Sequence, residues 1–215
     1  MHESQFSDNH HFKVPRGAYL FTVLVIGSLL SIISEKLTLG PSWIIITVVV
    51  ILLVPMVISI VRGHHGWTRV LSLCITGVIT LSLISSVSFL IYAMFHHSAS
   101  AASLFRSAGL LWFINIGVFA VWYWEIDGGG PLKRHSGKSE PIDFLFPQMT
   151  SEIPGWEKWT PSLFDYLYLA FNTNTAFSPT DTMVISKRAK ILMMIQSSIS
   201  LLIVAVLAAR AINIA

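Results

Sequence analysis

The stretch WIIITVVVILLVPMVISIV, Trp43–Val61, contains no charged residue, and it decides the class of fold. As an α-helix it would be about 28 Å long at ~1.5 Å per residue, close to the ~30 Å hydrocarbon core of a bilayer. Trp43 is an aromatic residue of the kind that lies at membrane interfaces, and Pro55 is a kink that membrane helices tolerate. The stretch therefore predicts a membrane-spanning helix.

The rest of the chain has the same character, because 53% of its residues are hydrophobic and only 12% are charged. A soluble domain usually carries about 25% charged residues. Further apolar helices are expected over residues 17–33, 70–95, 106–125 and 190–210. We therefore predict an all-α fold, a polytopic membrane helix bundle of five spans. Cys74, the single cysteine, lies inside one of these spans, so an internal disulfide is excluded.

Composition divides the chain into four parts. Residues 1–16 form a polar tail with three His residues, and residues 17–125 are expected to form a bundle of four membrane helices. Residues 126–161 are rich in Pro and Gly and predict a loop on the membrane surface or over the end of the bundle. Residues 162–215 are expected to form a short half-helix, a turn and the last membrane helix.

The basic residues are distributed unevenly about these spans. Of the 14 Lys and Arg residues, eleven fall on one side of the predicted bundle and only Lys36, Arg106 and Arg210 fall on the other. The eleven are Lys13, Arg16, Arg62, Arg69, Lys133, Arg134, Lys138, Lys158, Lys187, Arg188 and Lys190. The positive-inside rule then places the N-terminus and the loop 126–161 in the cytoplasm. The first apolar run resembles a signal sequence, but no A-x-A-like site follows it before Pro41, so a retained helix is predicted.

The segment LFDYLYLAFNTNTAF, residues 163–177, differs from the other apolar segments. Its length as a helix is about 22 Å, too short for the hydrocarbon core. Residues 172–175 are four polar residues in a row, which lipid would penalise unless they meet protein or water. Ser178-Pro179 is expected to end the helix. These features predict a re-entrant half-helix that enters and leaves on the cytoplasmic side, like a pore loop.

Residues 171–181, FNTNTAFSPTD, resemble the pore segment of two-helix potassium channels, which reads roughly F-V-T-L-T-T-V-G-Y-G-D. Ser178 and Thr180 stand where the two filter glycines would be, and Pro179 stands at the tyrosine. A potassium filter needs glycines so that successive carbonyls turn inward, so selectivity of that kind is not expected. Potassium-channel loops also enter from outside, whereas the charge distribution places this segment on the cytoplasmic side.

A broader resemblance, reaching back to Tyr123, is to a family of uncharacterised bacterial integral membrane proteins. Their C-terminal part reads W-D-F-L-Y-F-S-F, followed by a T-x-x-D-like turn, a basic cluster and a last helix. This resemblance implies a location in a bacterial inner membrane.

Two functional hypotheses follow. The first is a channel-like oligomer that conducts ions through a pore lined by the segment 171–181 and the last helix; the second is a non-conducting membrane scaffold or regulatory subunit. The pore-lining candidates are Asn172, Thr173, Asn174, Thr175, Ser178, Thr180, Asp181, Gln196 and Ser200. The expected partners are the lipid bilayer, ions and further copies of the chain. Nucleic acid is not expected, because the basic residues lie at helix ends and form no single stripe.

Catalysis is not expected, because the sequence contains no G-x-S-x-G, H-E-x-x-H or glycine-rich phosphate loop. The acidic residues Glu125, Asp127, Asp165 and Asp181 are interpreted as capping and ion-pairing groups, with Asp181 capping the last helix. Adjacent histidines point about 100° apart on a helix, so the three His-His pairs predict solvated side chains at the interface. No cofactor or metal is expected. Asn115, in the fourth span, is expected to bond to a neighbouring helix.

Overall fold

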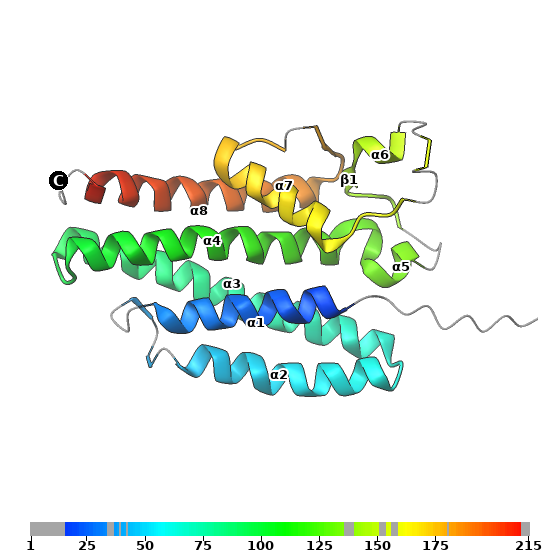
Figure 1. The fold of residues 1–215 in the computed structure, drawn as a ribbon, viewed down its shortest axis with the longest axis horizontal. Helices are drawn as coiled ribbons and strands as arrows, with labels where there is room; N and C mark the ends of the chain where they lie inside the picture. The colour runs from blue at the N-terminus through cyan, green and yellow to red at the C-terminus, as the bar shows by residue number, and fades with distance from the viewer. Residues whose placement is uncertain are drawn as a thin grey trace, which may run out of the picture.

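The computed structural model describes residues 16–33, 37–38, 40–41, 43–135, 140–150, 154–155, 159–179 and 181–211. These residues are almost entirely helical. The long helices are α1 (Gly17–Ile32), α2 (Trp43–Val61), α3 (His65–His96), α4 (Ala101–Ile126) and α8 (Lys187–Ala211). They lie roughly side by side, and the start of α1 and the end of α8 are at opposite ends of the bundle (Figure 1).

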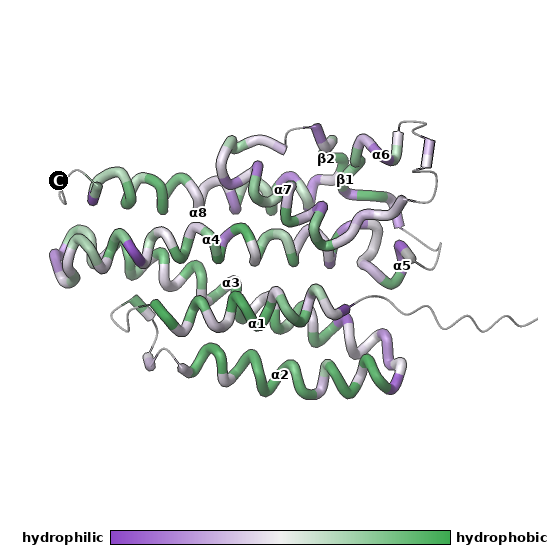
Figure 2. Tube along the Cα trace, in the orientation of Figure 1, coloured by the Kyte–Doolittle hydropathy of each residue, from purple (hydrophilic) through white to green (hydrophobic). Residues whose placement is uncertain are grey.

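Four of these helices, α2, α3, α4 and α8, are long and apolar enough to cross a membrane. The fifth, α1, is apolar but has only 16 residues, about 24 Å at ~1.5 Å per residue. The structure thus confirms a helical bundle with four candidate spans, and a fifth span at α1 stays a prediction. Hydrophobic residues run along the long helices, whereas hydrophilic ones gather towards their ends and around α5 and α6 (Figure 2).

Helix α4 is the centre of the bundle. It packs against α1, α3, α7 and α8, whereas α2 contacts only α1 and α3 extensively. Accordingly, 67% of the most apolar stretch of α4 is buried, against 22% in α2. Glycine allows close approach in two places: a Cβ on Gly117 would lie 3.0 Å from Ile26 of α1, and one on Gly27 would lie 3.0 Å from Ile46 of α2. Small residues at such crossings are typical of membrane bundles.

Several predicted boundaries were wrong by a few residues. Helix α3 begins at His65 instead of residue 70, so the expected loop 62–69 is reduced to a short turn. Helix α4 begins at Ala101, five residues before Arg106, where Ser100 accepts a hydrogen bond from the backbone of Ser103. Polar and basic residues such as Arg69 and Arg106 lie within the first turns of these helices, because only the central part of each helix must be apolar.

The connection between α4 and α7 is more ordered than a surface loop. It contains a 3₁₀ turn (Asp127–Gly129), α5 (Pro131–His135), β1 (Phe144–Leu145) and α6 (Pro147–Thr150). Strand β1 pairs with β2 (Met183–Val184) in an antiparallel ladder, with Phe144 opposite Val184 and Leu145 opposite Met183. This ladder joins the connection to the segment just before α8. The described elements of the connection therefore lie over one end of the bundle (Figure 1).

Helix α7 (Leu163–Ala176) has 14 residues and lies within the range 163–177 predicted for a half-helix. The structure confirms a short helix there, and its re-entrant placement in a membrane stays a prediction. It starts at the end of the bundle that carries β1 and runs obliquely along α4 and α8 (Figure 1). Phe177 ends it in the left-handed conformation, with a φ of 54°. The chain then returns through Ser178 and Pro179 to β2 at the same end. A re-entrant segment requires that the chain enter and leave at the same end of the bundle.

Candidate functional site

The N-terminus of α7 is fixed by a reciprocal cap. The backbone N–H and the hydroxyl of Ser162 both donate to Asp165 Oδ2 at 2.7 Å. Asp165 therefore has the capping role predicted for it. The carboxylate also lies in the first turn, where the positive end of the helix dipole stabilises it.

The polar run 172–175 near the end of α7 satisfies its side chains in two ways. Asn172, Thr173 and Thr175 donate to carbonyls four residues earlier in the same helix, at 2.8–3.0 Å. Asn174 instead bonds outside its helix. A polar row that would be costly in lipid is thus largely neutralised by its own backbone.

Asn174 is the centre of a buried group that we term the central polar cluster: Asn115, Tyr123, Asn174, Gln196 and Ser200. Asn115 Nδ2 donates to Asn174 Oδ1 at 2.6 Å and to the Gln196 carbonyl at 3.2 Å. The Ser200 hydroxyl donates to the Asn174 carbonyl at 2.7 Å. The prediction that Asn115 bonds to neighbouring helices is confirmed.

Gln196 extends the cluster towards the capped end of the bundle. Its Nε2 donates to the Ala170 carbonyl at 2.8 Å, and its Oε1 accepts from the Tyr123 hydroxyl. Asn115 and Ser200 lie near the middle of α4 and α8, so Asn174 reaches about half the depth of the bundle. The cluster therefore fastens α7 to both helices at mid-depth.

Of the nine residues predicted to line a pore, the eight that the structure describes fall into two groups. Thr173, Asn174, Gln196 and Ser200 are buried between helices, and all four hydrogen-bond to protein atoms. Thr175 and Asp181 are exposed, and Asn172 and Ser178 are half-buried, whereas Thr180 lies outside the described residues. Only an assembly of several chains would place the exposed members on one axis, so their pore-lining role stays a prediction.

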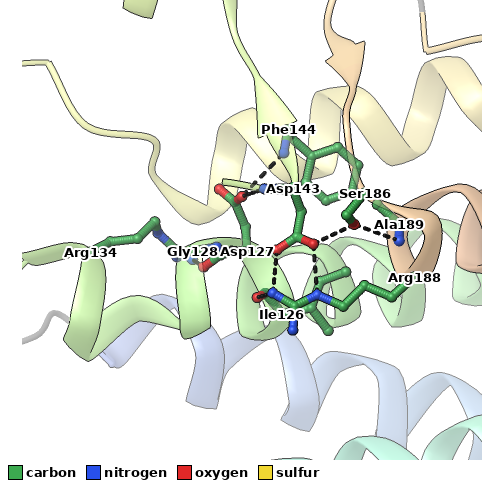
Figure 3. Close-up of polar contacts among 9 residues, drawn as sticks. All are labelled: Ile126, Asp127, Gly128, Arg134, Asp143, Phe144, Ser186, Arg188 and Ala189. Atoms are coloured by element: carbon green, nitrogen blue, oxygen red, sulfur yellow. Dashed lines mark hydrogen bonds and ion pairs between the residues drawn. The ribbon is translucent and has the colours of Figure 1, made fainter. Parts of the chain in front are cut away.

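A second polar group lies at the end of the bundle where the connection covers it (Figure 3). We term it the carboxylate cap, and its core is Asp127, Asp143, Ser186 and Arg188. Asp127 accepts from the backbone of Asp143 at 2.7 Å and from the Tyr166 hydroxyl at 2.6 Å. Since Tyr166 belongs to α7, Asp127 joins the end of α4 both to the connection and to the half-helix.

Asp143 completes this cap from the strand side. It accepts from Arg188 Nε at 2.6 Å and Nη2 at 2.7 Å, a two-point contact that fixes the guanidinium plane. The Ser186 hydroxyl also donates to it, and the Gly128 N–H donates at 3.2 Å. Both carboxylates are fully buried and surrounded by donors, so this arrangement orients segments and offers no free base.

Ser186, and not Asp181, caps the N-terminus of α8. Its hydroxyl accepts from the Ala189 N–H at 3.1 Å, and the helix begins at Lys187. The predicted cap at Asp181 was therefore wrong, because strand β2 separates Asp181 from the helix. The sequence analysis does not indicate a role for Asp143, although its neighbours Ile142 and Phe144 are of types that favour strands.

An ion pair between α1 and α4 was also missed. Arg16 Nη1 donates to Glu125 Oε1 at 2.8 Å, and both side chains are buried. The Arg16 guanidinium also lies 5.3 Å from the centre of the Trp124 ring. The sequence indicates Arg16 only as a charge that sets the orientation, whereas the pair shows that it also binds the start of α1 to α4.

Comparison of the chain with protein-family models, curated proteins and solved structures finds no match. Among the described residues, no group of three or more His, Cys, Asp or Glu side chains is placed to hold a metal ion. The site is thus characterised by its hydrogen bonds alone. They describe a short helix, α7, held near its C-terminus by the central polar cluster and near its N-terminus by the carboxylate cap.

Proposed function

We propose that this is a multi-pass membrane protein in which α7 is a re-entrant half-helix that closes the bundle, and that it acts as a non-conducting scaffold or regulatory subunit. The observation that carries the proposal is the bonding of Asn174 to Asn115 of α4 and to Ser200 of α8. A polar tip bonded to two neighbouring helices acts as a plug.

The outer surfaces support the same proposal. The exposed face of α7 carries Phe164, Tyr168 and Phe171, which are 74%, 52% and 45% exposed. Aromatic residues of this kind are favoured both at lipid interfaces and at the centres of protein interfaces. The exposed residues on α8 are mainly apolar, including Ile191, Met194 and Leu201. Such surfaces suit contact with lipid or with another membrane protein better than contact with hydrated ions.

The channel hypothesis remains the second candidate because of one observation. Asn172 and Thr175 of α7, and Ser178 just after it, lie outside the central polar cluster, and none of them is buried. In an oligomer whose axis runs beside α7, these polar groups of several chains would meet there.

Flux measurements on purified protein in liposomes separate the two candidates. We expect ion flux equal to that of protein-free liposomes across a range of voltage and pH. Flux above that level would contradict the plug. Its loss in Asn172→Leu and Thr175→Leu, but not in the matched Ser198→Leu on the exposed side of α8, would establish the channel hypothesis.

A photo-crosslinking amino acid at Tyr168 provides the positive test of the scaffold role. In the native membrane we expect adducts of defined mass with a second membrane protein. The same probe at Ile51, an exposed residue of α2, is the control for random lipid-facing contact. Adducts with lipid alone at both positions would contradict the scaffold role.

A further inference from the structure

A pocket of about 180 Å³ lies at the capped end of the bundle, apart from both polar groups described above. Its walls come from the start of α1, the start of α3 and the glycine-rich turn after α4. The lining residues that matter here are Arg16, His65, Arg69, Gly129, Gly130 and Lys133. The volume is far above the ~10–15 Å³ that a single water molecule requires. The pocket can therefore hold a polyatomic group.

The two arginines on its walls are held in place, and neither uses all of its donors. Arg16 donates to Glu125, and Arg69 Nη1 donates to the Gly129 carbonyl. A guanidinium has five N–H donors, and among the described residues each of these two has one hydrogen bond. Lys133 pairs with Glu140 at the rim, where both side chains are over 40% exposed. That contact lowers the pKa of the Glu140 carboxyl.

The wall formed by Gly129 and Gly130 leaves space in the pocket because of its backbone conformation. Gly129 and Gly130 have φ values of 79° and 98°, which other residues rarely adopt. A Cβ on Gly130 would lie 3.1 Å from the Glu125 carbonyl and 3.5 Å from Arg69 Cζ. The turn thus lets backbone and guanidinium approach closely. A side chain at either position would fill the space beside the cations.

The basic side chains of the lining favour an anion, and Glu125 and Glu140 pair with two of them. Two arginines, a lysine and a histidine line the pocket, and no acidic side chain is among its lining residues. Arginine donors in fixed planes suit the oxygens of phosphate. Basic pockets between membrane helices are also known sites for lipid headgroups. Trp67, which is 69% exposed beside Gly66, is an interfacial residue at the same end.

We propose that this pocket binds a phosphate-bearing anion, with the headgroup of an anionic phospholipid and free inorganic phosphate as the two sources of that chemistry. The assignment is independent of whether the bundle conducts. It gives a role to Arg69, Lys133, Gly129 and Gly130, which belong to neither polar group.

The test measures binding of phosphatidylglycerol, with phosphatidylcholine as the neutral lipid, to detergent-purified protein by mass spectrometry of the intact complex. Arg69→Gln and Lys133→Gln remove charge while leaving the Arg16–Glu125 pair intact. Each should weaken binding of phosphatidylglycerol about fivefold, the effect expected from one basic residue near an anionic lipid. The matched control is Arg62→Gln with Lys187→Gln, which removes two exposed charges near the same end and should leave binding unchanged.

Inorganic phosphate distinguishes the two sources. If it raises the melting temperature of the wild type but not of the Arg69→Gln, Lys133→Gln double variant, and phosphatidylglycerol is not retained, the ligand is free phosphate. Retained phosphatidylglycerol that phosphate displaces only weakly assigns the site to a headgroup. The proposal is overturned if neither ligand binds, or if the double variant binds as the wild type does. Helical circular dichroism of each variant verifies that it is folded.

Discussion

At the scale of single residues, Asn174 shows how a polar side chain becomes part of a membrane bundle. Its neighbours Thr173 and Thr175 bond back to their own helix, but its amide donates to the Trp112 carbonyl at 3.3 Å and accepts from Asn115. A back-bonded hydroxyl stabilises no tertiary contact. The bond between Asn115 and Asn174 does stabilise a tertiary contact, because the two side chains are buried and belong to different helices, α4 and α7.

This pair predicts strong coupling between positions 115 and 174. Asn115→Leu leaves Asn174 Oδ1 without its donor, so we expect a loss of about 1–3 kcal/mol in the free energy of unfolding. Asn174→Leu should cost a similar amount. Interhelical hydrogen bonds in membranes couple by about 0.6 to 1.7 kcal/mol, so the double variant should lose less than the sum. The free energies of unfolding of the wild type, the two single variants and the double variant can be measured in mixed micelles. Additive losses would contradict a direct bond.

At the scale of secondary-structure elements, α4 carries the fold because glycine lets α1 approach it closely. Gly117 faces Ile26, whose side chain is 3% exposed and has little room to move. Gly109, two turns earlier in α4, has no atom within 4 Å of an added Cβ. The same substitution at these two positions of one helix therefore has opposite expected effects.

Gly117→Ala should destabilise the bundle by about 1–3 kcal/mol, the usual cost of adding a methyl group to a packed core. Gly109→Ala should instead stabilise it by about 0.5–1 kcal/mol, since alanine is the better helix former. Thermal unfolding of the two variants and the wild type shows whether each substitution raises or lowers the stability. Equal effects would show that α1 does not pack on α4 through Gly117.

At the scale of the whole molecule, charge is concentrated at the end of the bundle that the connection covers. The described basic residues there are Arg16, Arg62, Arg69, Lys133, Arg134, Lys187, Arg188 and Lys190. Arg106 and Arg210 lie towards the other end. Several of the first group also have structural partners, such as Glu125 and Asp143. The basic residues at this end thus have two roles: they favour one orientation of the bundle in the membrane, and several of them bind acidic residues that hold the helices and the connection in place.

The orientation can be tested by labelling. In a Cys74→Ala background, cysteines at Thr150 in α6 and at Ser98 between α3 and α4 should react with an impermeant reagent from opposite sides, since both positions are exposed at opposite ends of the bundle. The positive-inside rule places Thr150 in the cytoplasm. Labelling of Thr150→Cys from outside intact cells would reverse the assignment, and labelling of both from one side would contradict the arrangement of spans.

The sequence by itself determined the membrane class, the bounds of α2 and the short length of α7. These follow from local properties: an apolar run must match the thickness of a bilayer, and Ser178-Pro179 ends a helix wherever the helix lies. The bounds of α3 and α8 were less accurate, since interfacial turns tolerate both helix and loop. The local composition does not indicate whether such a turn continues the helix or belongs to the loop.

Only the tertiary structure decided which polar residues meet. It divided the run 172–175 between an outer face and the central polar cluster, and it paired Arg16 with Glu125 and Asp143 with Arg188 across more than forty positions of sequence. No periodicity in the sequence indicates such partners. They are fixed because a buried charge or amide must find a partner, and the packing of α1, α4, α7 and α8 determines which one is within reach.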